Sequence, residues 1–165
     1  MATTLPVPIE FQLPDGWRPA PPDEVGAPGA AFVALHSPPD AGFTANITID
    51  GEYRPDQVPL LEMADGSVAR LRETGASVVL TERSEMGSRE APGLLQKLAV
   101  TTTAGGTLRD VVQTQAYLSL LDVADPRNRV VIRLVLTSTV SQHPLLLGDF
   151  EDFVRSVQPR TDTES

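Results

Sequence analysis

The sequence contains no cysteine and only two histidines. Without cysteine the chain has no disulfide bonds, no thiolate metal ligands and no cysteine nucleophile. The histidines, His36 and His143, belong neither to an HExxH pattern nor to any spacing that would direct two imidazoles to one metal ion. We therefore predict no metal ion and no cofactor, and we expect both histidines to face solvent or to lie at strand ends.

Basic residues are also scarce, because 13 Lys and Arg stand against 22 Asp and Glu, for a net charge of −9. Such a charge repels phosphates and anionic lipids, whose binding depends on Lys and Arg. No run approaches the roughly 20 apolar residues of a membrane span, and the N-terminal stretch lacks the basic and apolar segments of a signal peptide. We expect a cytoplasmic protein with no nucleic-acid partner and no integral membrane segment.

The length and composition are those of an ordinary globular domain. The chain has 165 residues, of which 41% are hydrophobic, and a domain of this size can bury a sizeable core. We expect residues 1–160 to form one domain. The polar residues 161–165 follow Pro159 and are expected to be a disordered C-terminal tail.

Seven stretches are typical of β-strands, because apolar or β-branched residues alternate with polar ones between turn-forming residues. These stretches are 6–13, 30–37, 43–53, 76–86, 93–103, 107–121 and 129–140. The adjacent glycines 105 and 106 predict a hairpin rather than a phosphate-binding loop, because no helix pattern follows them. Residues 124–128 predict a second hairpin turn. Residues 18–29 are rich in Pro and Gly, and we expect them to be irregular.

Two helices are predicted from apolar residues that recur at the helical period. The first is capped by Asp56, has Pro59 in its first turn and ends near Gly75, with a stripe formed by Leu60, Leu61, Ala64, Val68 and Leu71. The second begins at Pro144, with a stripe formed by Leu146, Phe150, Phe153, Val154 and Val157. Three acids of the second helix, Asp149, Glu151 and Asp152, diverge around it and indicate a solvated face rather than a metal site.

Consecutive strands combined with two helices indicate the α+β class. We expect a single antiparallel sheet of about six to seven strands, flanked by two main helices. Leu134 and Phe153 should lie in the core. Truncation of either to alanine should cost about 2–5 kcal/mol.

Few residues suggest a functional site. Arg133 interrupts an apolar strand, so it lies either on the wetter sheet face or opposite an acid on a neighbouring strand. Gln113 and Gln115 share a strand face with Arg109 and Tyr117, which suggests an open polar surface suited to binding. We identify no catalytic residues and no defined partner-binding residues.

Two other patterns carry no chemistry. Ser37 and Asp40 lie near His36, but no Gly-x-Ser-x-Gly turn holds a nucleophile. The sequon at Asn46 is interpreted as a chance match within a strand, because no export is expected. We therefore expect no enzymatic activity.

The only tryptophan, Trp17, follows the Pro-Asp-Gly turn at residues 14–16. It is either an exposed recognition residue or a residue that packs this turn against the sheet. We favour the second interpretation, because the large indole can close one end of a core while its N–H finds an acceptor.

Three segments in a characteristic order resemble the Mog1p/PsbP-like superfamily. They are "FQLPDGW" at residues 11–17, "GFTANITID" at residues 42–50 and "FEDFVRSVQP" at residues 150–159. Within the superfamily the sequence is similar to actinobacterial LpqN/LpqT-type proteins, but it has neither their signal peptide nor their lipidation cysteine. The resemblance implies an α/β/α sandwich and a mostly non-enzymatic role, and it transfers no catalytic or metal-binding residue.

The sequence and the resemblance together lead to one functional hypothesis and one alternative. We expect a non-enzymatic cytoplasmic protein-binding module, adaptor or chaperone-like, that holds another protein on a sheet face or in a sheet-helix groove. The alternative is a carrier of a small apolar ligand in a pocket between the sheet and the Leu146/Phe150/Phe153 helix. The identity of the partner and the oligomeric state stay open, homo-oligomers included.

Overall fold

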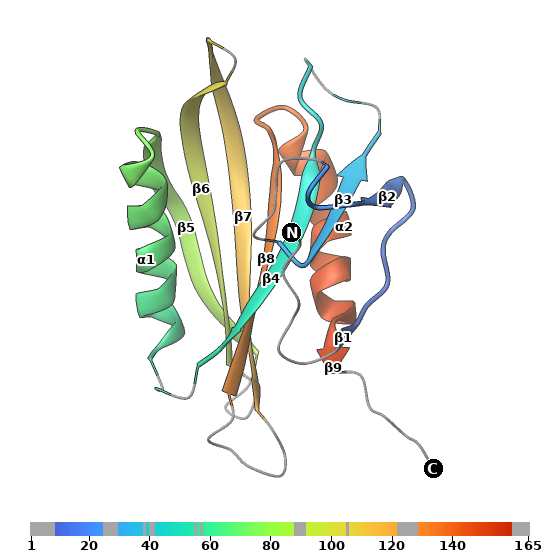
Figure 1. Ribbon diagram of the computed structural model, residues 1–165, viewed down its shortest axis with the longest axis vertical. Helices are drawn as coiled ribbons and strands as arrows, with labels where there is room; N and C mark the ends of the chain where they lie inside the picture. Colours follow the sequence, from blue (N-terminus) through green and yellow to red (C-terminus); the bar gives the residue numbers. More distant parts are fainter. Residues whose placement is uncertain are drawn as a thin grey trace.

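A seven-stranded antiparallel sheet lies between two helices, one on each face (Figure 1). The computed structural model describes residues 9–24, 30–37, 39, 42–54, 56, 58–87, 92–104, 106–121 and 129–159. The elements are β1 (Ile9–Glu10), β2 (Trp17–Ala20), β3 (Phe32–His36), β4 (Asn46–Tyr53), α1 (Leu60–Glu73), β5 (Ser77–Gly87), β6 (Pro92–Ala104), β7 (Thr107–Leu121), β8 (Arg129–Thr139), α2 (His143–Ser156) and β9 (Gln158–Pro159). The α+β class and the single antiparallel sheet are therefore confirmed.

The strand order in the sheet is β2-β3-β4-β8-β7-β6-β5, while β1 pairs separately with β9. The hairpin between β6 and β7 is confirmed, with residue 106 in the left-handed region at φ 79° and Ala104 paired with Thr107. The second predicted hairpin turn, at 124–128, and the predicted tail, at 161–165, lie outside the described residues.

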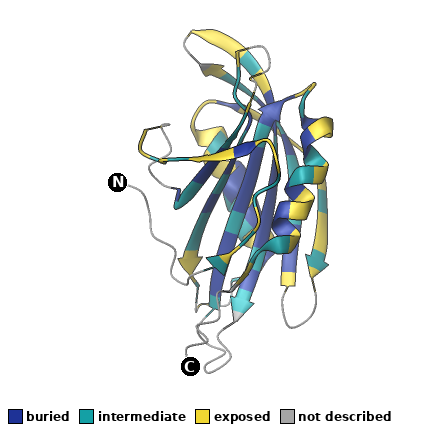
Figure 2. Cartoon of the chain, turned by 90° about the vertical axis from the view of Figure 1, so that its right-hand side faces the viewer, coloured by how far each residue is buried: buried dark blue, intermediate teal, exposed yellow. Residues whose placement is uncertain are grey.

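The two helices cover different parts of the sheet. α1 packs on β5, β6 and β7, whereas α2 packs on the opposite face, chiefly over β8. Figure 2 shows the buried residues concentrated in the central strands between the two helices. Each sheet face therefore has a part over which no described helix lies.

Strand β8 shows why the centre of the sheet is almost entirely apolar. Its residues Ile132 and Leu134 face α2, and Val131 and Val135 face the α1 side. All four are buried, because β8 lies in the middle of the sheet, between β4 and β7. The apolar character of residues 130–136, which only Arg133 interrupts, follows from this position.

The interface between α2 and the sheet is filled by side chains. Leu146, Phe150 and Phe153 project from α2 and are 4%, 0% and 0% exposed, and they pack with Leu134 and Ile47 of the sheet. The predicted core positions of Leu134 and Phe153 are confirmed. The space that we considered as a pocket for an apolar ligand is occupied by this core.

The N-terminal part of the fold differs from the prediction in two places. The strand expected at 6–13 is reduced, within the described residues, to the short β1. Residues 18–20, expected to be irregular, belong to β2, which pairs with β3 from Trp17–His36 to Ala20–Val33. Pro19 is tolerated there because β2 is an edge strand, and its missing N–H removes no bond from a central ladder.

Helix α1 begins later than predicted. Its N-cap residue is Pro59, which makes no side-chain cap, so Asp56 does not cap the helix as we expected. Asp56 instead binds Arg54, and its Oδ1 accepts a 3.4 Å hydrogen bond from the Val58 N–H. Leu61, expected on the buried stripe, is 50% exposed, because its neighbour Leu60 takes the position that faces the sheet.

The interpretation of Trp17 as a packing residue is confirmed, because it is 7% exposed and belongs to the core under α2. Its Nε1 donates a 3.2 Å hydrogen bond to Oδ2 of Asp149. Its ring meets the ring of His36 edge to face at 5.0 Å. Asp149 therefore ties α2 to β2, which corrects its assignment to a solvated face, whereas Glu151 and Asp152 are exposed.

Replacing Asp149 with alanine is expected to lower the free energy of unfolding by about 1–2 kcal/mol, because the indole N–H loses its acceptor at a buried position. Urea denaturation followed by Trp17 fluorescence measures this loss. The control is Asp152→Ala on the same helix, which removes an exposed pair with Arg155 and should change stability by less than about 0.5 kcal/mol. Equal losses in the two variants would contradict the structural role of Asp149.

Candidate functional site

A groove of about 520 Å³ runs between α1 and the part of the sheet that α1 leaves uncovered. We call it the α1 groove. Strands β4, β7 and β8 form its floor, and one side of α1 forms its wall. Its lining residues are Asp50, Glu52, Arg54, Val58, Glu62, Met63, Gly66, Arg70, Tyr117, Val131 and Arg133.

An ion pair between neighbouring strands lies on the floor of the groove. Asp50 of β4 is the register partner of Arg133 of β8, and Nη1 of Arg133 lies 3.4 Å from Oδ2 of Asp50. Both side chains are about one-third exposed. The two interpretations of Arg133 therefore hold together, because it lies on the wetter sheet face and it also pairs with an acid on the next strand.

Burial shapes the electrostatics of this pair. It raises the pKa of Asp50, an effect that the positive charge of Arg133 opposes. Nε of Arg133 is buried and has no hydrogen-bond partner among the described residues. The floor of the groove therefore presents one acid and one arginine, each about one-third exposed, to a molecule that enters it.

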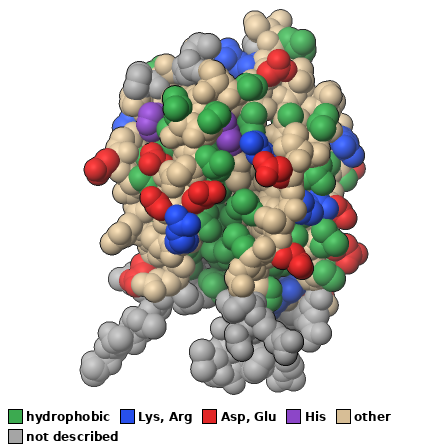
Figure 3. All heavy atoms as spheres, turned by 180° about the vertical axis from the view of Figure 1, so that it is seen from behind, with side chains coloured by type: hydrophobic (Ala, Val, Ile, Leu, Met, Phe, Trp, Pro, Cys, Tyr) green, Lys and Arg blue, Asp and Glu red, His purple; other side chains and the backbone are tan. Residues whose placement is uncertain are grey.

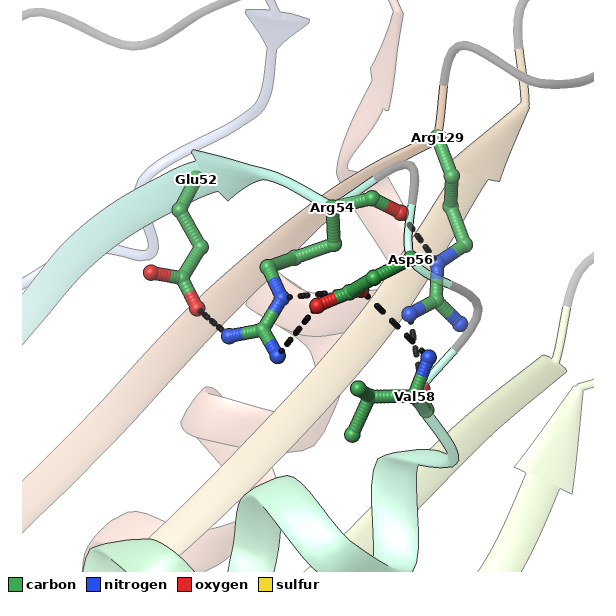
Figure 4. A network of polar contacts seen from close by, with 5 residues as sticks. All are labelled: Glu52, Arg54, Asp56, Val58 and Arg129. Carbon is green, nitrogen blue, oxygen red and sulfur yellow. Dashed lines mark hydrogen bonds and ion pairs between the residues drawn. The ribbon is translucent and has the colours of Figure 1, made fainter.

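The mouth of the groove is held by a second set of arginine contacts (Figure 4). Arg54 binds Oε1 of Glu52 at 2.7 Å and Oδ2 of Asp56 at 3.1 Å. Arg129 donates from Nε to the carbonyl of Arg54 at 3.1 Å and from Nη2 to the carbonyl of Val58 at 2.7 Å. These bonds attach the connection between β4 and α1 to β8, and so they fix where the wall of the groove begins.

The polar sheet surface that we expected around Gln113 and Gln115 is largely covered. Gln115 and Gln96 are fully buried beneath α1, where Nε2 of Gln96 donates to Oε1 of Gln115 at 2.8 Å and to the carbonyl of Ala64 at 3.2 Å. Tyr117 also donates to Oε1 of Gln115 at 3.2 Å. The expected open surface is therefore wrong at this place, and the open part of the face lies one strand further, over β8 and β4.

A smaller groove of about 290 Å³ lies on the other face, between α2 and strands β5 and β6. Leu95 and Leu147 contribute its apolar part, and Lys97 pairs with Glu82 at 3.6 Å along it. Figure 3 views the molecule from behind and shows hydrophobic side chains gathered in the lower half, with charged side chains around them.

Neither histidine forms a reactive site with an acid or a nucleophile at the surface. His143 is 2% exposed, so the expectation of a solvent-facing position is wrong for it. Its Nδ1 lies 2.7 Å from Oγ of Ser138, and its Nε2 lies 2.7 Å from Oγ1 of Thr114. His36 is partly buried against Trp17. Among the described residues, no group of three or more His, Cys, Asp and Glu could hold a metal ion.

Comparison with known proteins identifies the fold. No protein-family model matches the sequence, and no curated protein matches it at a significant level. LpqN of Mycobacterium tuberculosis, which is involved in cell envelope biogenesis, aligns with 93% of this chain and 86% of its own, with a TM-score of 0.62 and 16% identity. The cyanobacterial PsbP of Synechocystis aligns with 92% of this chain and 86% of its own, with a TM-score of 0.61 and 12% identity.

The Ran-binding protein Mog1p of Saccharomyces cerevisiae has the same architecture. It aligns with 92% of this chain and 89% of its own, with a TM-score of 0.58 and 15% identity. The chain therefore has the Mog1p/PsbP-like fold, as the sequence resemblance implied. Likeness at this level of identity defines the fold, and the function has to be argued from the chain's own surfaces. Among the described residues, no helix is long and apolar enough to span a membrane.

Sequence reasoning singled out Arg133 but missed the acids that accompany it. Asp50 and Glu52 alternate along β4 with the buried Ile47 and Ile49, which face α2. This alternation places both acids on the sheet face opposite α2. This alternation is visible in the sequence, but the sequence does not show which strand pairs with β4.

Proposed function

We propose that this chain is a non-enzymatic, cytoplasmic protein-binding module, adaptor or chaperone-like, whose α1 groove receives a charged segment of the partner protein. The observation that carries the proposal is the groove itself, which lies where a helix and the sheet leave a charged surface accessible. Its lining includes arginine, tyrosine and methionine, the residue types that are enriched where proteins bind one another.

The charges of the groove favour a partner segment that carries both signs. Three acids line it, and three arginines lie among them, so the lining has no net formal charge although the whole protein carries −9. Alternating charges select a partner by complementarity and penalise a wrong register. A peptide segment with acidic and basic residues in alternation fits such a surface better than a uniformly charged one.

Gly66 provides a test that separates binding from folding. It lies in α1 at the wall of the groove, and a Cβ added to it would meet Nη1 of Arg70 at 3.4 Å. Gly66→Gln should therefore extend a side chain into the groove, and it should stabilise the helix by up to about 1 kcal/mol because glycine is a poor helix former. Affinity purification from the source organism at near-physiological salt should recover a stoichiometric partner with the wild type and at least about tenfold less with this variant.

The matched control is Gly148→Gln in α2. A Cβ at Gly148 has no atom within 4 Å, so the same substitution gains the same helix propensity on the opposite face. This variant should retain the partner at the wild-type level. Absence of any stoichiometric partner for the wild type would refute the proposal, and equal loss in both variants would refute the assignment of the α1 groove.

A further inference from the structure

Strand β5 forms the outer edge of the seven-stranded sheet on the side of α1 (Figure 1). It is 11 residues long, from Ser77 to Gly87, and contains no proline. One of its sides pairs with β6, and none of the described strands lies on its other side. The backbone N–H and C=O groups that alternate residues turn to that side therefore have no partner strand.

The opposite edge of the sheet is poorly suited to further pairing. β2 has only four residues, and one of them is Pro19, which has no N–H to donate. A short edge strand and a proline are two of the devices by which proteins prevent sheets from joining edge to edge. β5 has neither device, so the two edges of this sheet differ in what they permit.

The two halves of β5 also differ. In the first half, Nη2 of Arg72 in α1 donates a 2.9 Å hydrogen bond to the carbonyl of Val78. The pairing with β6 is irregular between Leu80 and Glu82, and a bulge twists an edge away from a neighbouring strand. In the second half, from Glu82 to Gly87, the pairing with β6 is uninterrupted. The second half is therefore the regular part of the open edge.

We propose that the second half of β5 pairs antiparallel with the same segment of a second copy of this chain, so that the two sheets become continuous. Such a pair of identical strands has a two-fold axis, which places one residue opposite its own copy. An axis at Glu82, Arg83 or Glu85 would set a charge against the same charge. An axis at Ser84 avoids this, and it sets Arg83 of each copy opposite the partner's Glu85.

This register extends an ion pair that is already present. Arg83 and Glu85 are two residues apart on a regular strand, so they point to the same face of the sheet. Nη1 of Arg83 lies 2.8 Å from Oδ1 of Asp65 in α1, which places this face on the α1 side. Glu85 is exposed. The two-fold axis therefore adds a carboxylate to each of two arginines that α1 already holds in position.

An exposed apolar residue lies beside the same edge. Leu61 is 50% exposed, and it lies one helical turn before Asp65 on the same side of α1. Because Asp65 contacts Arg83 of β5, this side of α1 borders the open edge. A two-fold axis perpendicular to the sheet keeps both α1 helices on one face, so the second helix approaches Leu61. The inference goes beyond the α1 groove, because no residue of β5 lines that groove.

Charge reversal at the edge tests the proposal. Sedimentation velocity at about 200 µM wild type should show a species of twice the 17.7 kDa chain mass in equilibrium with the monomer. Glu85→Arg should weaken this dimer at least about tenfold, because it sets arginine opposite arginine at both places. The matched control is Glu24→Arg, an exposed position after β2 at the other edge, with the same change in net charge. This control should dimerise as the wild type does.

A mixture of two variants tests the register itself. Arg83→Glu alone should also weaken the dimer at least about tenfold, because it sets glutamate opposite glutamate. Mixed with Glu85→Arg, it should restore the dimer, because each facing pair in the mixed species is one arginine and one glutamate. Amide hydrogen exchange at alternate residues from 82 to 87 should slow when the wild type is concentrated from about 2 to about 200 µM, and it should not slow in Glu85→Arg.

Three results would overturn the proposal. They are a monomeric wild type at the higher concentration, a wild-type level of dimer in Glu85→Arg, and a mixture that is no more dimeric than either variant alone. Arg83→Glu also loses the bond to Asp65, so its amide spectrum is recorded first to confirm that it has folded. If it has not, the comparison of Glu85→Arg with Glu24→Arg and the exchange rates of the edge amides decide the matter.

Discussion

Truncation of Phe153 to alanine is expected to lower the free energy of unfolding by about 3–5 kcal/mol. The side chain is fully buried between α2 and the sheet. Its ring meets that of Phe11 at a centroid distance of 5.1 Å and an angle of 71°, and Phe11 in turn meets Phe32 at 4.9 Å. The substitution therefore leaves a cavity and also removes an edge-to-face aromatic contact.

Equilibrium denaturation in urea, with Trp17 fluorescence as the probe, measures this loss as a lower midpoint with an unchanged slope. Leu145→Ala serves as the control, because Leu145 lies on the same helix and is 79% exposed. Its effect should be within about 0.5 kcal/mol. An unchanged midpoint for Phe153→Ala would show that α2 does not present this residue to the sheet.

The second large effect is a loss of stability at acidic pH that originates at His143. Burial, and to a smaller degree the charge of Lys97, lowers the pKa of His143 from 6.5 to about 4. The folded protein favours the neutral ring. His143 therefore makes its full contribution to the free energy of unfolding at pH values above 6.5, which is the pKa of the ring in the unfolded chain. That contribution is lost as the pH falls towards 4, and the loss amounts to about 3 kcal/mol.

The hydroxyl groups around the ring define its neutral form. Nδ1 lies 2.7 Å from Oγ of Ser138 and Nε2 lies 2.7 Å from Oγ1 of Thr114. In the neutral ring one nitrogen donates to its hydroxyl partner, and the other nitrogen is an acceptor. Protonation of the ring removes this acceptor and places a charge where no described acid forms an ion pair with it.

Two measurements check the effect of pH. The difference between the unfolding free energies of the wild type and of His143→Gln should shrink by about 3 kcal/mol as the pH falls from 6.5 to 4. The carboxyl groups titrate in both proteins, so their contribution cancels in this difference. Proton NMR of the imidazole should show the midpoint directly. Titration of this ring near pH 6.5 in the folded protein would contradict its burial.

Much of the fold could be predicted from local patterns. Residues 130–136 predict a buried strand, and the spacing of Leu146, Phe150 and Phe153 predicts the face of α2, because periodicity depends on local sequence alone. Strand β2 was missed because it forms through pairing with β3. Its own composition, which includes Pro19, does not predict a strand. The buried position of His143 was missed because one of its two partners, Thr114, lies on β7, 29 positions earlier in the chain.

The α1 groove could be predicted only in part, for a similar reason. Arg133 was recognisable as a polar residue in an apolar strand, but Asp50 became its neighbour through the pairing of β4 with β8, which are far apart in the sequence. Gln115 was misplaced because the sequence does not say which strands α1 covers. Strand order and helix placement decide which parts of a sheet stay accessible, and both are properties of the whole chain.

The pairing of β1 with β9 has a consequence for how the protein is made. Ile9 lies opposite Pro159, and Nε2 of Gln158 donates to Oε1 of Glu10, 148 positions away in the chain. The Gln12 N–H likewise binds Oγ of Ser156 in α2. During synthesis, β1 therefore leaves the ribosome long before its partner strand exists. These contacts can form only after β9 has emerged, so this part of the native structure is completed after translation of the described region.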